Sequence, residues 1–176
     1  MAGLRAYALG VAELRAVVGA TGPAAERLRA IAAQAFPPGG AASAVPDRLG
    51  PIYRRVPGAP VVRPEDPTRR DLDALLAGTP ILPRRAAPVW RLVEAFAAGL
   101  AWSSSPAPED ARLTSLLGPA GLDLPPLEGL VAGWCRLDDA AVVPALHDWL
   151  ETSQAWTEAA GRAGRPRPDV VVLGLP

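Results

Sequence analysis

Residues 169–173, near the end of the chain, read Asp-Val-Val-Val-Leu, and this stretch decides the fold. Its consecutive β-branched side chains favour a strand. The unbroken apolar run indicates burial on both faces, in the middle of a sheet. A partner strand is predicted at residues 4–9, Leu-Arg-Ala-Tyr-Ala-Leu, where alternation places Arg5, Tyr7 and Leu9 on one side. A further short strand is expected around residues 134–137.

Helical spacing of apolar residues predicts most of the remaining elements. The expected helices cover residues 11–18, 23–35, 67–77, 88–101, 109–117 and 139–158. Pro144 disturbs the last of these, so that either its first turn is separate or the helix begins near the proline. Strands at both ends with helices between them predict a single α+β domain over residues 1–176, with helices on one or both faces of a small sheet.

Residues 37–67 differ from the rest because they hold eight of the 21 prolines. No helical pattern survives that density of proline. We therefore predict a long Pro-rich loop at about residues 37–67, of the kind that is usually functional or mobile in a compact domain.

The composition excludes several function classes. The 176 residues include 18 basic and 18 acidic side chains, so no global charge draws the chain to a polyanion. Cys135 and His147 are the only residues of their types, so neither an internal disulfide nor a zinc site of several His and Cys ligands is expected. Lysine is absent, which removes Schiff-base chemistry and the P-loop. We expect no cofactor and no metal, although the paired acids leave a magnesium site open.

No stretch of about 20 apolar residues is free of charge, and no signal peptide is recognisable at the start. The sequence thus predicts a cytoplasmic protein without a membrane partner.

Charge is unevenly distributed along the chain. Residues 47–91 hold nine arginines against five acids, a net charge of +4, whereas residues 109–158 hold two arginines against nine acids, a net charge of −7. One interpretation is a basic surface for an anionic partner; the other is mutual neutralisation across the fold. The arginines singled out for binding are Arg54, Arg55, Arg69 and Arg70. Trp102 is predicted either to line a pocket or a partner surface or to pack in the core. Few aromatic residues lie among the arginines, which argues against a nucleic-acid partner.

The candidates for catalysis are Cys135, His147 and Asp148. A thiolate near Arg136 would be reactive, but in a strand Cys135 points away from Arg136, and a free cysteine is usually buried. His147 falls on a polar helix face and would need a nucleophile within about 3 Å to act as a base.

The order of the elements supplies a resemblance. The chain opens with a strand bearing Tyr7, later runs from Gly133-Trp134 into Asp138-Asp139, and finishes with a strand after a helix bearing Trp156. It resembles small uncharacterised bacterial proteins of domain-of-unknown-function families. That resemblance implies an α+β domain with adjacent terminal strands, and it implies no substrate.

Two functions are consistent with these features. The first is a non-enzymatic binding or interaction protein of accessory, regulatory or immunity type, which would use residues 47–70 or an acidic face. That acidic face comprises Asp138, Asp139, Asp148 and Glu151. The second is a small biosynthetic or metabolic enzyme acting on an anionic small molecule. The partner would be a protein or an anionic small molecule, and zero net charge is compatible with a homodimer. A concave pocket gathering Arg, Asp and Trp102 would favour the enzyme.

Overall fold

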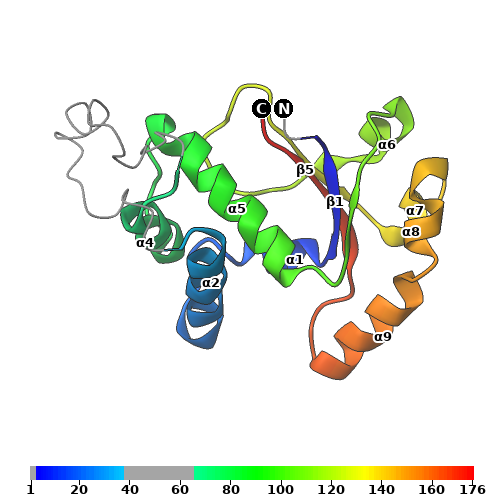
Figure 1. Ribbon diagram of the computed structural model, residues 1–176, viewed down its shortest axis with the longest axis horizontal. Helices are drawn as coiled ribbons and strands as arrows, with labels where there is room; N and C mark the ends of the chain where they lie inside the picture. The colour runs from blue at the N-terminus through cyan, green and yellow to red at the C-terminus, as the bar shows by residue number, and fades with distance from the viewer. Residues whose placement is uncertain (1–2, 38–65) are drawn as a thin grey trace, which may run out of the picture.

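The computed structural model describes residues 3–37 and 66–176, and it has the predicted α+β fold. Its sheet is antiparallel with the strand order β2-β1-β5-β4-β3. The strands are β1 (Arg5–Leu9), β2 (Ser104–Pro106), β3 (Gly118–Pro119), β4 (Val131–Cys135) and β5 (Asp169–Gly174). The apolar strand β5 is central, as its composition predicts. It lies beside β1, so the first and last strands of the chain are neighbours (Figure 1).

Helices cover both faces of the sheet (Figure 1). One face carries α1 (Val11–Arg15), α2 (Gly22–Ala35), α4 (Arg69–Ala77) and α5 (Ala86–Leu100), with the 3-10 turn η3 (Pro83–Arg85) before α5. The other carries α6 (Ala111–Leu116), α7 (Leu137–Ala140), η4 (Pro144–Leu146), α8 (His147–Leu150) and α9 (Ser153–Ala163). We call these the α5 face and the α9 face.

Strand alternation distributes the core between the two faces. On β1, Tyr7 and Leu9 pack on the α5 face, whereas Ala6 and Ala8 pack on the α9 face. This is the alternation that the sequence predicts for residues 4–9, because successive strand side chains point to opposite faces. The α5 face also buries Phe96, which is fully inaccessible to solvent.

The largest departure from prediction is the expected helix over residues 139–158. The structure divides it into α7, η4, α8 and α9. Val143 has extended backbone angles directly before Pro144, which lacks an N–H and disfavours a helical residue before it. The helix therefore stops and restarts, as the alternative of a separate first turn anticipates.

Other boundaries shift by a few residues. The strand expected at 134–137 runs from Val131 to Cys135, and Leu137 already begins α7. Short strands β2 and β3 occupy segments expected to be loops, because β1 and β4 supply partners that local sequence does not show. The helix expected from residue 67 starts after Thr68, whose side chain accepts from Asp71 N, and it ends at left-handed Gly78 as predicted. Most of the Pro-rich stretch, residues 38–65, lies outside the described residues.

Candidate functional site

A cavity of about 370 Å³ lies on the α5 face, against β1, β2 and the second half of α5. We call it the Tyr7 pocket. Its lining residues are Arg5, Tyr7, Phe36, Arg91, Glu94, Ala95, Ala98 and Ser104. It combines two guanidinium groups, a carboxylate and two hydroxyl groups with an aromatic ring and small apolar side chains.

A strand and a helix position most of the polar side chains of the pocket. On β1, residues two apart share a face, which places Arg5 beside Tyr7. On α5, the i, i+3, i+7 spacing brings Arg91, Glu94 and Ala98 to one side of the helix. Ser104 on β2 is the cross-strand partner of Tyr7 and therefore faces the same way.

Tyr7 is the most buried of the lining residues, with only 2 % of its surface exposed. Burial raises the pKa of the Tyr7 hydroxyl, and the negative charge of Glu94 raises it further, while the nearby Arg5 opposes both effects. The phenol therefore keeps its proton at neutral pH. It can donate a hydrogen bond to an anionic or carbonyl oxygen.

The charged groups around Tyr7 are not equivalent. Arg91 is already engaged: its Nη1 donates to Asp66 Oδ1 at 2.6 Å, and its guanidinium lies 5.6 Å from the centre of the Phe36 ring. Arg5 donates to the Ser104 hydroxyl at 3.3 Å, and its guanidinium also acts on the Tyr7 hydroxyl. Among residues 3–37 and 66–176, neither Arg5 nor Glu94 forms a salt bridge. Within the described parts of the chain, one positive and one negative group of this pocket thus lack an ion-pair partner.

A second hollow adjoins the Tyr7 pocket through the shared Phe36 side chain. It has a volume of about 530 Å³ and lies between α2 and α4. Arg69, one of the predicted binding residues, lines it and is 3.9 Å from Asp73. Arg70 is an exposed residue of α4. Arg54 and Arg55 lie outside the described residues, so their predicted role stays a prediction.

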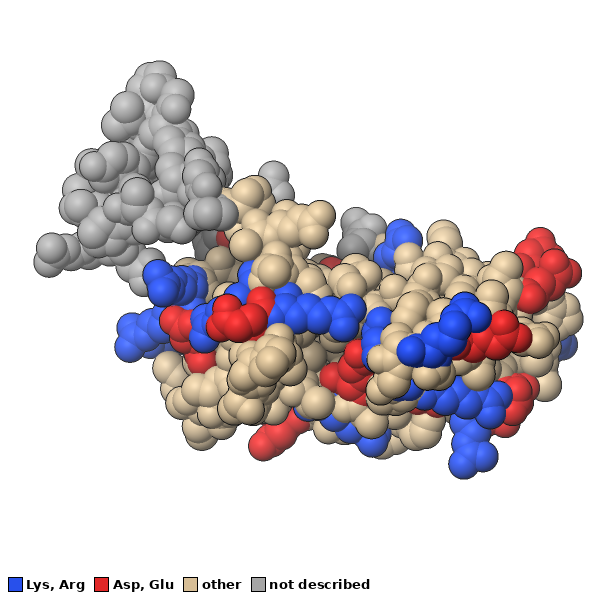
Figure 2. Space-filling view, turned by 90° about the horizontal axis from the view of Figure 1, so that it is seen from below, with Lys and Arg blue, Asp and Glu red and all other residues tan. Residues whose placement is uncertain are grey.

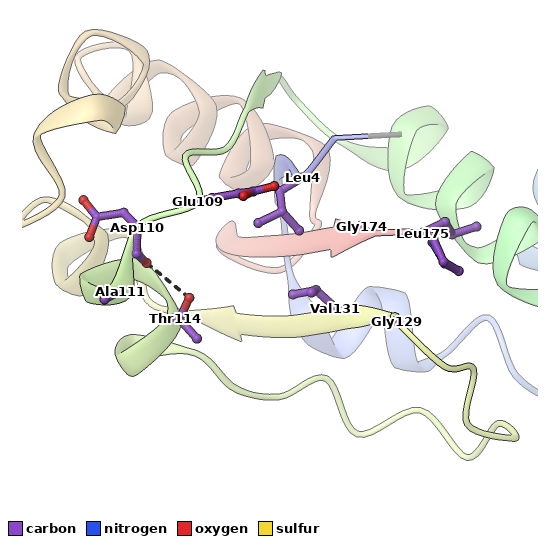
Figure 3. Close-up of a pocket in the computed structure, with 10 residues that line it drawn as sticks. Leu4, Glu109, Asp110, Ala111, Thr114, Gly129, Val131, Gly174 and Leu175 are labelled. Carbon is purple, nitrogen blue, oxygen red and sulfur yellow. Dashed lines mark hydrogen bonds between the residues drawn. The ribbon is translucent and has the colours of Figure 1, made fainter. Parts of the chain in front are cut away.

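A third hollow, of about 390 Å³, lies at one end of the sheet on the α9 face (Figure 3). Leu4, directly before β1, and Val131, at the start of β4, approach it from the two sides of Gly174, which lies on the intervening strand β5. The Asp110 side chain caps α6 by accepting from Arg112 N at 2.7 Å, and its carboxylate points away from the strands (Figure 3). This hollow also holds the Glu109 carboxylate, but no arginine among the described residues lines it, so it lacks the positive group that the Tyr7 pocket offers to an anion.

The residues predicted as catalytic lie elsewhere. Cys135 is buried in the core of the α9 face, and burial, followed by the charges of Asp139 and Asp169, raises the pKa of its thiol to about 11. The Nε2 atom of His147 is 2.6 Å from the backbone oxygen of Ala141, in a hydrogen bond whose direction depends on the tautomer. None of the described hydrogen bonds joins these two side chains, and Asp148 is exposed on α8.

Trp102 is half-buried and packs against the core of the α9 face, outside the lining of the Tyr7 pocket. The Arg165 guanidinium covers its ring at 4.3 Å and donates two hydrogen bonds of 2.9 Å to Glu13. Trp102 Nε1 is buried without a hydrogen-bond partner among the described residues. These contacts give Trp102 a packing role, and its binding role stays a prediction.

Opposite charges lie next to each other over much of the surface that Figure 2 displays. Of the predicted acidic face, Asp138 is 3.5 Å from Arg167, and both side chains are largely exposed. Arg29 donates to Asp73 at 2.7 Å between α2 and α4. These pairs favour local neutralisation of charge over one extended basic or acidic surface. Within the described parts of the chain, no three His, Cys, Asp or Glu side chains are grouped as metal ligands would be.

The sequence contains part of the signal for the Tyr7 pocket. Alternation places Arg5 and Tyr7 on one side of their strand, and Arg91 and Glu94 recur at helical spacing. Neither pattern shows that the strand and α5 pack together, because that contact joins segments about 90 residues apart and is set by the tertiary fold.

Comparisons with known proteins add no family to this description. No protein-family model, curated protein or solved structure matches the chain. Among the described helices, none is both long enough and apolar enough to cross a bilayer.

Proposed function

We propose that this protein is a non-enzymatic binding module that takes a small molecule with an anionic group in the Tyr7 pocket. The observation that carries the proposal is the position of Arg5, whose guanidinium lacks a carboxylate partner among the described residues and lies beside the protonated hydroxyl of Tyr7. A guanidinium and a neutral phenol are complementary to a carboxylate or phosphate oxygen. The volume of about 370 Å³ falls in the range of small-molecule sites.

Binding is favoured over catalysis by what surrounds the pocket. Neither Cys135 nor His147 lines it. The raised pKa of Tyr7 suits a hydrogen-bond donor better than a general base, since a base must be deprotonated near the working pH. The alternative of a small enzyme acting on an anionic small molecule would use the same pocket, so the ligand is the first thing to identify.

A thermal-shift screen tests the proposal. The panel contains small carboxylates, small phosphates and free amino acids, added to the wild type and to Arg5→Gln. A ligand at 100 times its Kd stabilises a protein by about 2.7 kcal/mol, which gives a clear rise in Tm. We expect at least one compound to stabilise the wild type and to lose that effect in Arg5→Gln.

Arg162→Gln is the matched control, because Arg162 is exposed on α9, on the other face of the sheet. It should respond as the wild type does. A panel without any shift, or shifts that Arg5→Gln retains in full, would overturn the proposal.

A further inference from the structure

The Tyr7 pocket contains groups of both charges, and this narrows the class of ligand beyond the requirement for an anionic group. Arg91 is neutralised by Asp66 and is held against Phe36. Among the lining residues that the structure describes, the charged groups without an ion-pair partner are the guanidinium of Arg5 and the carboxylate of Glu94, whose charges sum to zero. A simple anion in the pocket would gain from Arg5 and lose to Glu94.

Arg5 and Glu94 are available at the same time because they do not neutralise each other. No salt bridge joins them, although both act on the Tyr7 hydroxyl: Arg5 through a hydrogen bond and Glu94 through its charge. They come from different elements, since Arg5 lies on β1 and Glu94 on α5. The pocket thus presents a positive and a negative group around one buried hydroxyl.

We infer that the ligand is a zwitterion of the size of a free amino acid, with a carboxylate and a protonated amine. The carboxylate would accept from the guanidinium of Arg5 and from the Tyr7 hydroxyl. The amine would donate to Glu94. This inference rests on the proposed function and names the class of ligand for the same pocket.

The remaining lining fits the carbon portion of such a ligand. Phe36 supplies an aromatic wall, and Ala95 and Ala98 keep the α5 side of the cavity open because their side chains are short. Ser104 supplies a second hydroxyl next to Arg5. A volume of about 370 Å³ is near the lower end of small-molecule sites, which favours a compact ligand over an oligomer or a nucleotide.

Each charged contact should contribute measurably to affinity. A hydrogen bond to a charged group changes affinity by a factor of about 10–100. Removing the positive charge of the ligand should therefore weaken binding at least about tenfold, because Glu94 would be left without a partner in the occupied pocket.

Calorimetric titration with the 20 standard L-amino acids and their N-acetyl derivatives tests this inference. Acetylation removes the charge of the amine and keeps the carboxylate and the side chain. For the amino acid that binds best, we expect the wild type to bind the N-acetyl derivative at least about tenfold more weakly. Glu94→Gln should lose most of that preference, and Arg5→Gln should lose affinity for both compounds.

Glu151→Gln serves as the control, because Glu151 is an exposed acid on the α9 face. It should keep the wild-type preference, and circular dichroism should show all variants folded. If the N-acetyl derivatives bind as well as the free amino acids, or if Glu94→Gln keeps the full preference, the inference of a zwitterionic ligand is wrong. The proposed binding function would still hold in that case. If no compound binds in an Arg5-dependent way, the proposed function fails as well.

Discussion

Each face of the sheet buries one ionisable side chain whose pKa is raised first by burial, Tyr7 on the α5 face and Cys135 on the α9 face. They differ in what lies beside them. Tyr7 lines a cavity that is also lined by Arg5 and Glu94. Cys135 packs among apolar side chains and lines none of the cavities described above.

This difference separates a site from a core residue. Burial alone makes Cys135 a poor nucleophile, because the thiolate is the reactive form. Tyr7, like any tyrosine, is protonated at neutral pH, and burial reinforces this; because Tyr7 lines a cavity, its phenol can donate to a ligand that enters there. A shifted pKa therefore points to function only where space and complementary charges accompany it.

The largest loss of stability is expected when a large side chain in the core of the α5 face is truncated. Phe96 is fully buried on α5, so Phe96→Ala should reduce the free energy of unfolding by about 3–5 kcal/mol through lost burial and a new cavity. Urea denaturation would measure this change. Leu82→Ala is the control, because Leu82 is 55 % exposed and its truncation should cost no more than about 0.5 kcal/mol. Equal effects of the two substitutions would mean that the α5 face is not packed as described.

A smaller loss of stability is expected when the buried carboxylate of Asp71 on the α5 face is removed. Asp71 is 6 % exposed and accepts from Arg85 Nε at 2.9 Å and from Thr68 N at 2.8 Å. Burial by itself would raise the pKa of Asp71, but these hydrogen bonds outweigh it and the pKa is lowered. Asp71→Ala should destabilise the protein by about 2 kcal/mol.

The lowered pKa of Asp71 also fixes a pH dependence. The folded state favours the ionised carboxylate, so this contribution is complete above the ordinary pKa of an aspartate and is lost as the pH falls through the lowered value. Asp73→Ala provides the comparison on the same helix, because Asp73 is about half exposed and should contribute no more than about 1 kcal/mol. If the wild type and Asp71→Ala lost stability equally as the pH falls, Asp71 would not be the source of this pH dependence.

At neutral pH the smallest change is expected for the thiol of the α9 face, because its titration affects stability only at alkaline pH. Its pKa of about 11 exceeds the ordinary value of 9.0, so the folded state keeps a proton that the unfolded chain releases. The stability that Cys135 contributes is therefore present below pH 9 and is lost as the pH rises toward about 11. A disulfide reagent at pH 8 should react slowly with the native protein and rapidly in urea. Rapid labelling of the native protein would show that the thiol is accessible and ionised.

Much of the fold follows from local pattern. Three segments show in their own sequence both the element and its buried side: the valines of β5, the alternating residues of β1 and the regularly spaced apolar residues of α5. This works because side chains recur on one face every two residues in a strand and every 3.6 residues in a helix. The strands β2 and β3 escape local reasoning, since they are two or three residues long and are defined by their partners.

The candidate site was less accessible from the sequence. The charge runs direct attention to Arg54, Arg55, Arg69 and Arg70, whereas the Tyr7 pocket uses an isolated arginine near the start of the chain. Arg5 and Glu94 are almost 90 residues apart and meet at one cavity only because α5 packs on β1. A charge run describes composition, but a binding site depends on which single residues the tertiary fold brings together.

The Tyr7 pocket can be located in solution by an NMR titration of the ¹⁵N-labelled protein with its best-binding free amino acid. We expect amide shifts to change in β1, β2 and the second half of α5, around the Tyr7 pocket, and to stay constant around Cys135 and α7. Changes centred on the α9 face, or none at a saturating concentration, would contradict the proposal.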